Sequence, residues 1–438
     1  MKEEINKELK NKKAKVDSIE TRVEEGKEVK YVTIIGTAKK VRCPYCNKYT
    51  SSVHDVLKES KLKHLKAFER DYILLIRKRR FICHKCNKKF TEEINLNEKR
   101  SSISNALKIK IRKDLKNYNL SFKYIAESNN VSAYTVRKQL IEATSNYDRL
   151  RTLPEVISFD EFKADTSKGK YAFIINDPIR KKTLDILPTR KKYDLEQYFT
   201  LIENRNNVQY VISDMYEPYL ILTNAMFHNA KFIVDRFHYI RYIMQALDKI
   251  RIRLQEEYGY NSKEYRLLKN KKNVSLLRKY ANDVQWWVYT KRYKNGHIVE
   301  ILPGDVLREL LAINEDLKNG YYLKEQFLYI INKSTYEIAE KDLLEWIDLC
   351  KESKIKEFID ASKTIENWLP YIVNSFIDKR YSNGFTEGRN NKIKVVKRVG
   401  YGYRNFDIFR RRLLYIFNNT LSGGTSNGRK NNKQVKNK

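Results

Sequence analysis

Four of the five cysteines stand in two Cys-x-x-Cys pairs, a spacing typical of a metal site. They are Cys43, Cys46, Cys83 and Cys86. Each pair turns two thiolates to the same side of a tight loop, and two such loops supply the tetrahedral four-sulfur shell that zinc prefers. Two disulfides or unpaired core thiols are the alternatives, and a reducing cytosol disfavours disulfides. The spacing predicts a structural zinc ion whose shell is complete without His54, His64 or His84.

The residues before the second pair predict a zinc ribbon. Residues 72–82 predict a β-strand that leads into the second cysteine pair. Within it, Arg77, Arg79 and Arg80 could contact DNA phosphates, although a charge run is usually a solvated face. The fifth cysteine, Cys350, lies in an amphipathic segment, which predicts a packed helix residue.

Two short helical segments follow and predict a helix-turn-helix. Apolar residues recur at helical spacing over residues 104–143, through Ala106, Ile109, Leu115 and Leu120. Ser121 and Ser132 stand where an N-cap side chain accepts a first-turn N–H.

The second of these helices would present one face to a DNA major groove. That face consists of Ala133, Tyr134, Arg137 and Lys138. Val131, Val136 and Leu140 would pack inward. An ordinary helical hairpin with a basic face is the alternative, but the strongly basic chain favours DNA binding by Tyr134, Arg137 and Lys138.

After Pro154 the hydrophobic pattern changes to the alternation of β-strands. The predicted elements are strands at 155–160, 171–176 and 183–187, a helix at 193–204, a strand at 208–213, a helix, a strand at 231–234 and a long helix to about 258. Loops that contain Gly, Pro and charges make the first three strands antiparallel. This order is similar to that of a ribonuclease H-like domain.

Acidic residues stand at the ends of two of these strands. Asp160 ends the first strand, and Asp214 follows the strand at 208–213. Ends of neighbouring strands can bring side chains to one spot, and crowded carboxylates need a hard cation, Mg²⁺ or Mn²⁺, to offset their repulsion. Two such ions about 3.5–4 Å apart can activate the attacking oxygen and stabilise the leaving oxygen in phosphoryl transfer. A third acid is needed.

An acid near the C-terminus, Glu387, lies in the segment 382–394, and residues 400–403 and Phe406 follow it. Together with residues 160–162, 212–214 and 234–238, this segment resembles the DDE transposases of the ISL-three insertion-sequence family over nearly the whole chain. The resemblance implies Asp160, Asp214 and Glu387 as the magnesium-binding catalytic triad. It also implies an enzyme that binds the terminal inverted repeats of its element, cuts the ends and joins them to target DNA without a covalent protein–DNA intermediate.

Residues near the triad are predicted to support it. Asp235 is expected to have a structural role or to contact a residue that binds the metal, without binding the metal itself. His238 either orients a phosphate or the nucleophile, or is a core histidine. The DNA backbone is expected to contact Arg389, Lys392, Lys394, Lys397 and Arg398. Core positions are favoured over base-stacking platforms for Trp286, Trp287, Trp346 and Trp368.

The chain has 88 Lys and Arg against 54 Asp and Glu, a formal net charge of +34. This excess predicts a polyanionic partner, here double-stranded DNA. Neither an apolar run of about 18 residues nor an apolar leader is present, so we expect a cytoplasmic protein that joins the nucleoid through DNA and does not bind membranes. A homodimer or higher assembly is expected, because two DNA ends must be held at once.

These assignments predict a multidomain α+β chain with a mixed-sheet catalytic domain interrupted by helices. Its parts are a charged segment at 1–38, a zinc ribbon at 39–98, a helix-turn-helix at 99–150, the ribonuclease H-like catalytic domain at 151–260 and 371–420, a helical insertion at 261–370 and a disordered basic tail at 421–438. The insertion is required because 172 residues separate Asp214 from Glu387. A zinc-containing helix-turn-helix regulator without catalysis and a nuclease without strand transfer are the alternatives.

Overall fold

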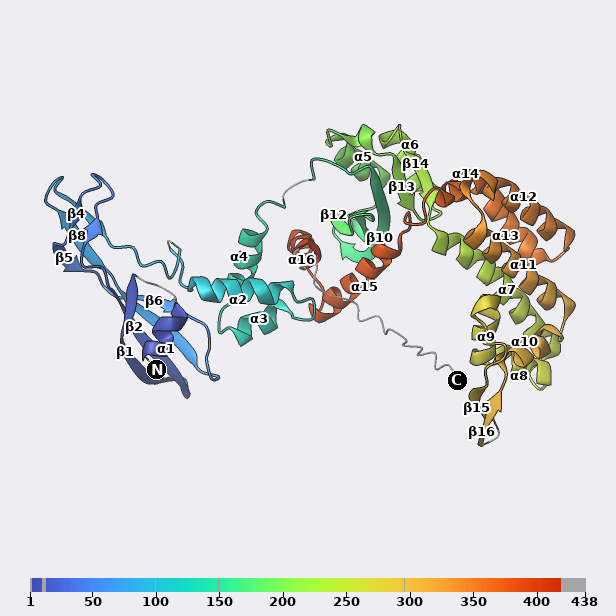
Figure 1. Ribbon diagram of the computed structural model, residues 1–438, viewed down its shortest axis with the longest axis horizontal. Coiled ribbons are helices and arrows are strands. Elements are labelled where there is room, and N and C mark those ends of the chain that lie inside the picture. The colour runs from blue at the N-terminus through green and yellow to red at the C-terminus, as the bar shows by residue number, and fades with distance from the viewer. Residues whose placement is uncertain (1, 10–12, 99, 148–149, 295, 419–438) are drawn as a thin grey trace, which may run out of the picture. The chain divides into compact units, whose positions relative to one another are not determined.

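The computed structural model describes residues 2–9, 13–98, 100–147, 150–294 and 296–418 (Figure 1). The chain has mixed α+β structure in two compact units. One joins residues 1–148 with 392–438, and the other holds residues 149–391. The tail predicted at 421–438 lies outside the described residues.

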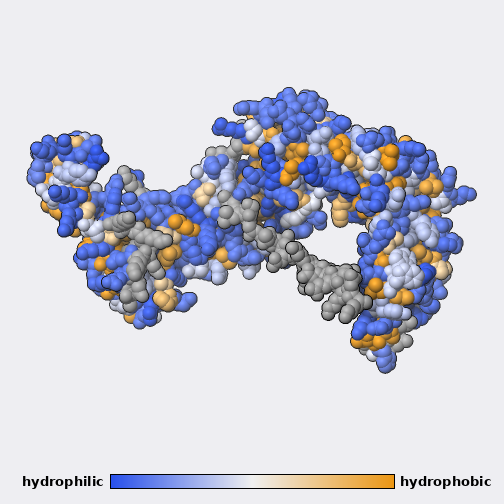
Figure 2. Space-filling view, in the orientation of Figure 1, coloured by the Kyte–Doolittle hydropathy of each residue, from blue (hydrophilic) through white to orange (hydrophobic). Residues whose placement is uncertain are grey.

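On the face shown in Figure 2, hydrophilic side chains predominate and hydrophobic ones form small separate patches, as expected for a chain with 32% charged residues. None of the described helices is long and apolar enough to span a membrane.

A four-stranded sheet begins the first unit, with the strand order β1-β2-β7-β6. Its strands are β1 (Ala14–Glu24), β2 (Lys27–Gly36), β6 (Ser60–Lys63) and β7 (Asp71–Arg77), and α1 (Lys2–Leu9) packs on β1. Glu25 and Gly26 both have positive φ, which suits the two-residue turn of a β-hairpin. The segment predicted only as charged, 1–38, therefore contributes a folded hairpin.

Shorter strands carry the cysteine loops. They are β3 (Val41–Arg42), β4 (Tyr49–Thr50), β5 (Val53–Val56), β8 (Arg79–Cys83) and β9 (Lys88–Thr91). The prediction of a single strand at 72–82 is wrong. The strand is interrupted at Lys78, and β7 and β8 belong to different sheets.

Three helices follow: α2 (Asn105–Lys116), α3 (Phe122–Ser128) and α4 (Ala133–Ala143). The N-caps predicted at Ser121 and Ser132 are confirmed, since each side chain accepts a backbone N–H in the first turn. Of the apolar residues at helical spacing, Leu115 is buried with Leu107 and Ile111, whereas the Ile109 side chain is 68% exposed.

The C-terminal helix α16 (Phe406–Asn418) packs against α2 and α4. Arg411 donates to the carbonyl oxygen of Thr144 at 2.7 Å, at the end of α4. The buried Arg412 donates to the carbonyl oxygens of Asn117 (3.0 Å) and Leu120 (3.2 Å), just after α2. These arginines therefore attach α16 to the residues that follow α2 and α4.

The second unit contains a five-stranded sheet in the order β12-β11-β10-β13-β14. The strands are β10 (Val156–Thr166), β11 (Gly169–Asp177), β12 (Lys182–Leu187), β13 (Tyr210–Ser213) and β14 (Lys231–Val234). The pairs among β10, β11 and β12 are antiparallel, whereas β10, β13 and β14 run parallel. Helices α5 (Lys192–Thr200), α6 (Glu217–Met226) and α7 (Arg236–Tyr258) connect and extend these strands, with a short turn η1 (Arg205–Asn207).

A mainly helical region follows α7. It consists of α8 (Lys263–Lys269), α9 (Lys271–Arg278), η2 (Ala281–Asp283), β15 (Thr290–Lys294), β16 (His297–Ile301), α10 (Pro303–Leu311), α11 (Glu315–Lys333), α12 (Tyr336–Glu352), α13 (Lys356–Asn367), α14 (Leu369–Val373) and η3 (Asn374–Phe376). One hydrophobic cluster runs from the sheet into these helices and includes Trp346 and Cys350, as predicted. Trp286 and Trp368 pack against it, but Trp287 is 77% exposed, so its predicted core position is wrong.

The helix α15 (Gly384–Val399) crosses from one unit to the other. Its residues through Asn391 belong to the second unit, and those from Lys392 belong to the first. Its first turns lie beside β10 (Figure 1), where hydrogen bonds attach them to the sheet.

Candidate functional site

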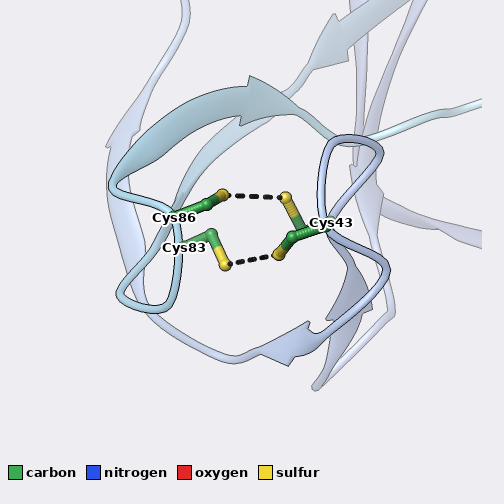
Figure 3. Close-up of side chains that lie close together, drawn as sticks. Cys43, Cys83 and Cys86 are labelled. Carbon is green, nitrogen blue, oxygen red and sulfur yellow. Dashed lines mark hydrogen bonds between the residues drawn. The ribbon is translucent and has the colours of Figure 1, made fainter.

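The four paired cysteines meet at one point, as Figure 3 shows for Cys43, Cys83 and Cys86. Sγ of Cys43 lies 3.7 Å from Sγ of Cys86, and Sγ of Cys46 lies 3.5 Å from Sγ of Cys83. All four are free thiols, and their sulfurs lie within 4.8 Å of one another. A tetrahedral zinc ion with bonds of roughly 2.3 Å would hold its sulfurs about 3.8 Å apart. The cage therefore fits zinc.

Local sequence builds both cysteine loops in the same way. Each reads Cys-x-x-Cys-Asn, and Asn47 and Asn87 adopt positive φ, a conformation that Asn tolerates well. The N–H of each Asn donates to the carbonyl oxygen of the first cysteine, at 3.0 Å for Cys43 and 2.7 Å for Cys83. Backbone N–H groups of Cys86 and then Lys85 help lower the pKa of Cys83 to about 7, which favours the metal-binding thiolate.

The arginines next to this cage form ion pairs with carboxylates of the same unit. Arg77 lies 2.5 Å from Glu59, Arg79 lies 2.6 Å from Glu92, and Arg80 pairs with Asp55. Arg79 also donates to the carbonyl oxygen of Ala38 at 3.0 Å. A phosphate at this ridge would compete with these ion pairs, so the DNA contact predicted here stays a prediction.

The strand register of the second unit aligns three acids. Ser158 pairs with Ile212 between β10 and β13, so two residues further along each chain Asp160 comes beside Asp214. Ser213 pairs with Val234, so one residue further Asp214 comes beside Asp235. Asp160 does not end its strand, as the sequence predicted, because β10 continues to Thr166. Asp160 lies level with the end of β13, so from this residue on β13 no longer pairs with that edge of β10.

Burial and charge crowding perturb this cluster. Burial, followed by repulsion from Asp214, raises the pKa of Asp160 to about 7. Burial also raises the pKa of Asp235. Burial alone would lower the pKa of His238, but the ion pair with Asp214, at 2.8 Å between Nε2 and Oδ1, raises it overall. His238 is therefore a partner of the second acid and not an isolated core histidine.

The segment that carries Glu387 is attached to these strands. Asn390 Nδ2 donates to Asp160 Oδ2 at 2.6 Å, and the backbone N–H of Asn383 donates to Asp235 Oδ1 at 2.8 Å. Glu387 lies between them on α15, one turn from Asn390, and its side chain is exposed. In the described part of the chain, only the four cysteines form a group of three or more His, Cys, Asp or Glu with ligand atoms within 4.8 Å. The carboxylates of Asp160, Asp214 and Glu387 therefore do not gather within 4.8 Å of one another in this structure.

Sequence reasoning missed a polar network beside Asp160. Tyr219 donates its hydroxyl to Glu161, and Arg190 pairs with the same carboxylate. The Arg190 guanidinium also lies over the rings of Tyr171, at 4.4 Å, and Tyr216, at 5.5 Å. Only the place of Glu161, directly after Asp160, could have indicated this network from sequence.

The predicted DNA-contacting residues differ in exposure. Tyr134, Arg137 and Lys138 are exposed on α4, on the opposite side from the buried Val136 and Leu140. On α15, Lys392, Lys394 and Arg398 are exposed, and Lys397 is partly exposed. Arg389 is different: it is 8% exposed, its guanidinium stacks on Phe385 at 4.5 Å and it donates to the Lys181 carbonyl oxygen at 3.4 Å. Its surroundings indicate a structural role in attaching α15.

Comparison with known families decides the class of this protein. A family model described as a transposase, of the DDE ISL-three type, matches residues 157–413, more than half of the chain. The chain belongs to this family of DDE transposases. A second model, described as the zinc-finger of transposase IS204/IS1001/IS1096/IS1165, matches residues 39–86 of this transposase and covers all four cysteines. The cysteine cage is therefore a structural zinc site in a zinc ribbon.

Two relatives show how far the similarity extends. The transposase for insertion sequence element IS1001 of Bordetella parapertussis is 23% identical over 382 residues, which cover 85% of this transposase and 88% of that protein. A protein named ATP-dependent protease from Lactococcus lactis subsp. lactis is 32% identical over 131 residues, which cover 30% of this chain and 40% of that protein. The first likeness spans both units, whereas the second covers too little of either chain to bear on the family.

Proposed function

We propose that this transposase binds the terminal inverted repeats of its element and carries out metal-dependent DNA strand cleavage and strand transfer. The strand register that sets Asp160 beside Asp214 carries the proposal, because it gathers acids from distant parts of the chain. The sheet order, with an antiparallel half followed by a parallel half, supports a ribonuclease H-like catalytic domain.

The donors of the cluster suit a hard divalent cation. Asp160 and Asp214 repel each other, and Oδ1 of Asn383 and Oδ1 of Asn390 are buried without a hydrogen-bond partner among the described residues. Mg²⁺ and Mn²⁺ prefer such oxygen ligands. Asp160, Asp214 and Glu387 would hold two ions. When bound, these ions would activate the attacking oxygen and stabilise the leaving one.

The other residues of the cluster prepare the acids for this task. His238 holds one oxygen of Asp214, and the backbone N–H of Glu161 donates to Asp160 Oδ1 at 2.7 Å. Because these contacts fix the carboxylates before DNA arrives, less conformational freedom is lost when a phosphodiester is positioned.

Sequence-specific binding belongs to the first unit in this proposal. The exposed face of α4 would enter a major groove as the recognition helix of a helix-turn-helix, through Tyr134, Arg137 and Lys138. The lysines of α15 would contact the DNA backbone, which positions the substrate without reading its sequence. A dimer or larger assembly would hold two ends together.

Separating DNA binding from chemistry tests the proposal. We expect D160N, D214N and E387Q each to bind terminal-repeat DNA as the wild type does, but to lose Mg²⁺-dependent cleavage and the joining of a pre-cut end to a target duplex. The matched control is D348N on α12, where the Asp348 side chain is 72% exposed. A non-catalytic regulator would bind the repeats and show no cleavage even as wild type. Cleavage without joining would indicate a nuclease instead.

A further inference from the structure

Hydrogen bonds from three residues attach the start of α15 to the sheet. Thr386 is fully buried, and its Oγ1 lies 3.1 Å from Ser158 Oγ and accepts from Asn176 Nδ2 at 2.9 Å. Asn383, 5% exposed, donates from Nδ2 to the carbonyl oxygen of Phe159 at 3.2 Å. The third residue is Asn390, which donates to Asp160. Buried hydrogen bonds tolerate little displacement, so this attachment defines one register of the helix against β10.

Asn390 makes the closest of these contacts, at the reactive group itself. Its Nδ2 lies 2.6 Å from Asp160 Oδ2, while the other oxygen of that carboxylate accepts from the Glu161 N–H. Each Asp160 oxygen therefore has one protein donor and a remaining lone pair. The Oδ1 atom of Asn390 is buried and has no hydrogen-bond partner among the described residues. An unpartnered buried carbonyl is costly unless a ligand satisfies it.

We propose that Asn390 is part of the metal site, an inference that rests on the function proposed above. Its Nδ2 orients Asp160, and its Oδ1 serves as a neutral oxygen ligand. A carboxamide oxygen is a hard donor of the kind found in Mg²⁺ and Ca²⁺ sites, and it adds no negative charge to an already crowded cluster. Because Glu387 is one helical turn before Asn390, the same contact fixes the turn of α15 that carries the third acid.

Mn²⁺ binding to the full-length, zinc-loaded protein without DNA tests this assignment, with free Mn²⁺ measured by electron paramagnetic resonance. N390A is expected to weaken the tightest Mn²⁺ site by roughly 10- to 100-fold, the loss typical when a group that orients a metal ligand is removed. N390D keeps an oxygen at this position but loses the Nδ2 donor to Asp160, so it is expected to bind Mn²⁺ more tightly than N390A. The matched control, N367A, removes an exposed Asn at the end of α13 and should leave the affinity unchanged.

The outcomes separate this inference from the proposed function. N390A binding Mn²⁺ within twofold of the wild type would overturn the role of Asn390. N390D as weak as N390A would overturn Oδ1 as a ligand. If the D160N/D214N double variant also retained the wild-type site, the proposed catalytic metal site itself would fail, whatever Asn390 does. Tryptophan fluorescence of each variant checks that the second unit is folded, since all four Trp lie between residues 286 and 368.

Discussion

Replacing the first acid, Asp160→Asn, should stabilise the metal-free second unit. The pKa of Asp160 is about 7 in the fold against 3.8 for an ordinary Asp, so the folded protein resists ionising this carboxyl. Its contribution to stability is complete below pH 3.8 and is lost as the pH rises to about 7. At about 1.4 kcal/mol per pH unit, the raised pKa lowers the free energy of unfolding by about 4 kcal/mol at pH 8, where the carboxyl is ionised in the fold, and by about 2 kcal/mol at pH 5, where the fold keeps it protonated.

Asparagine removes this penalty and keeps one oxygen, which can accept from the Glu161 N–H; its amino group then faces Asn390, which must turn its carboxamide to accept from it. We therefore expect D160N to raise the free energy of unfolding by up to about 4 kcal/mol at pH 8, and by about 2 kcal/mol less at pH 5. A catalytic substitution that stabilises the protein is the expected sign of a site whose charges are crowded for function.

Urea unfolding followed by Trp fluorescence is the suitable assay. All four Trp lie in the second unit with Asp160, so the signal reports the right part of the chain. The buffers should lack divalent cations but contain no chelator, so that the zinc site stays filled. D348N is the matched control and should change little at either pH. A D160N variant no more stable than the wild type at pH 8, or one with equal gains at both pH values, would refute the reasoning.

Three further predictions address the first unit. C83A should lose zinc, measured as metal content, and unfold the ribbon, but leave the urea midpoint of Trp fluorescence unchanged; retained zinc would contradict the four-sulfur site. R412M removes the Arg412 donor from the Leu120 carbonyl group and one of the two donors from the Asn117 carbonyl group, and should destabilise this unit by roughly 1–3 kcal/mol, measured by far-UV circular dichroism; unchanged stability would mean that these two hydrogen bonds do not stabilise the unit. If the net charge of +34 serves DNA and six to ten phosphates are neutralised, affinity should fall by roughly 10³ to 10⁵ between 50 and 200 mM salt. K138A should weaken DNA binding. An affinity that does not change with salt would show that the net positive charge does not serve to bind DNA phosphates.

Local signals explain why part of the fold could be predicted. The cysteine spacing, the serine N-caps and the strand at 231–234 depend on a few adjacent residues, and the structure has each where the sequence indicated it. The hairpin β1–β2 could not be found in this way. Most of β1 is exposed, so its strand pattern is weak, and β2 is stabilised by parallel pairing with β7, about 40 residues later.

Partners distant in sequence also decide the surroundings of single residues. The arginines at 77, 79 and 80 pair with Glu59, Glu92 and Asp55, which lie outside the basic run, so the run itself did not indicate these ion pairs. Trp287 was assigned to the core by residue type, but it precedes the hairpin β15–β16, where the ring is left exposed. Nothing in the sequence singled out Asn390, because its proposed role depends on a contact with Asp160 that forms only in the folded chain.

The third acid poses the remaining physical problem, because Glu387 must approach two carboxylates that already repel each other. The attachment of α15 through Thr386 and Asn390 solves half of it by bringing the helix to β10 without relying on the acid itself. The other half is a matter of charge, because a divalent cation would offset the repulsion among the three carboxylates and so favour the approach of Glu387. We therefore expect the catalytic site to be incomplete until Mg²⁺ or Mn²⁺ binds.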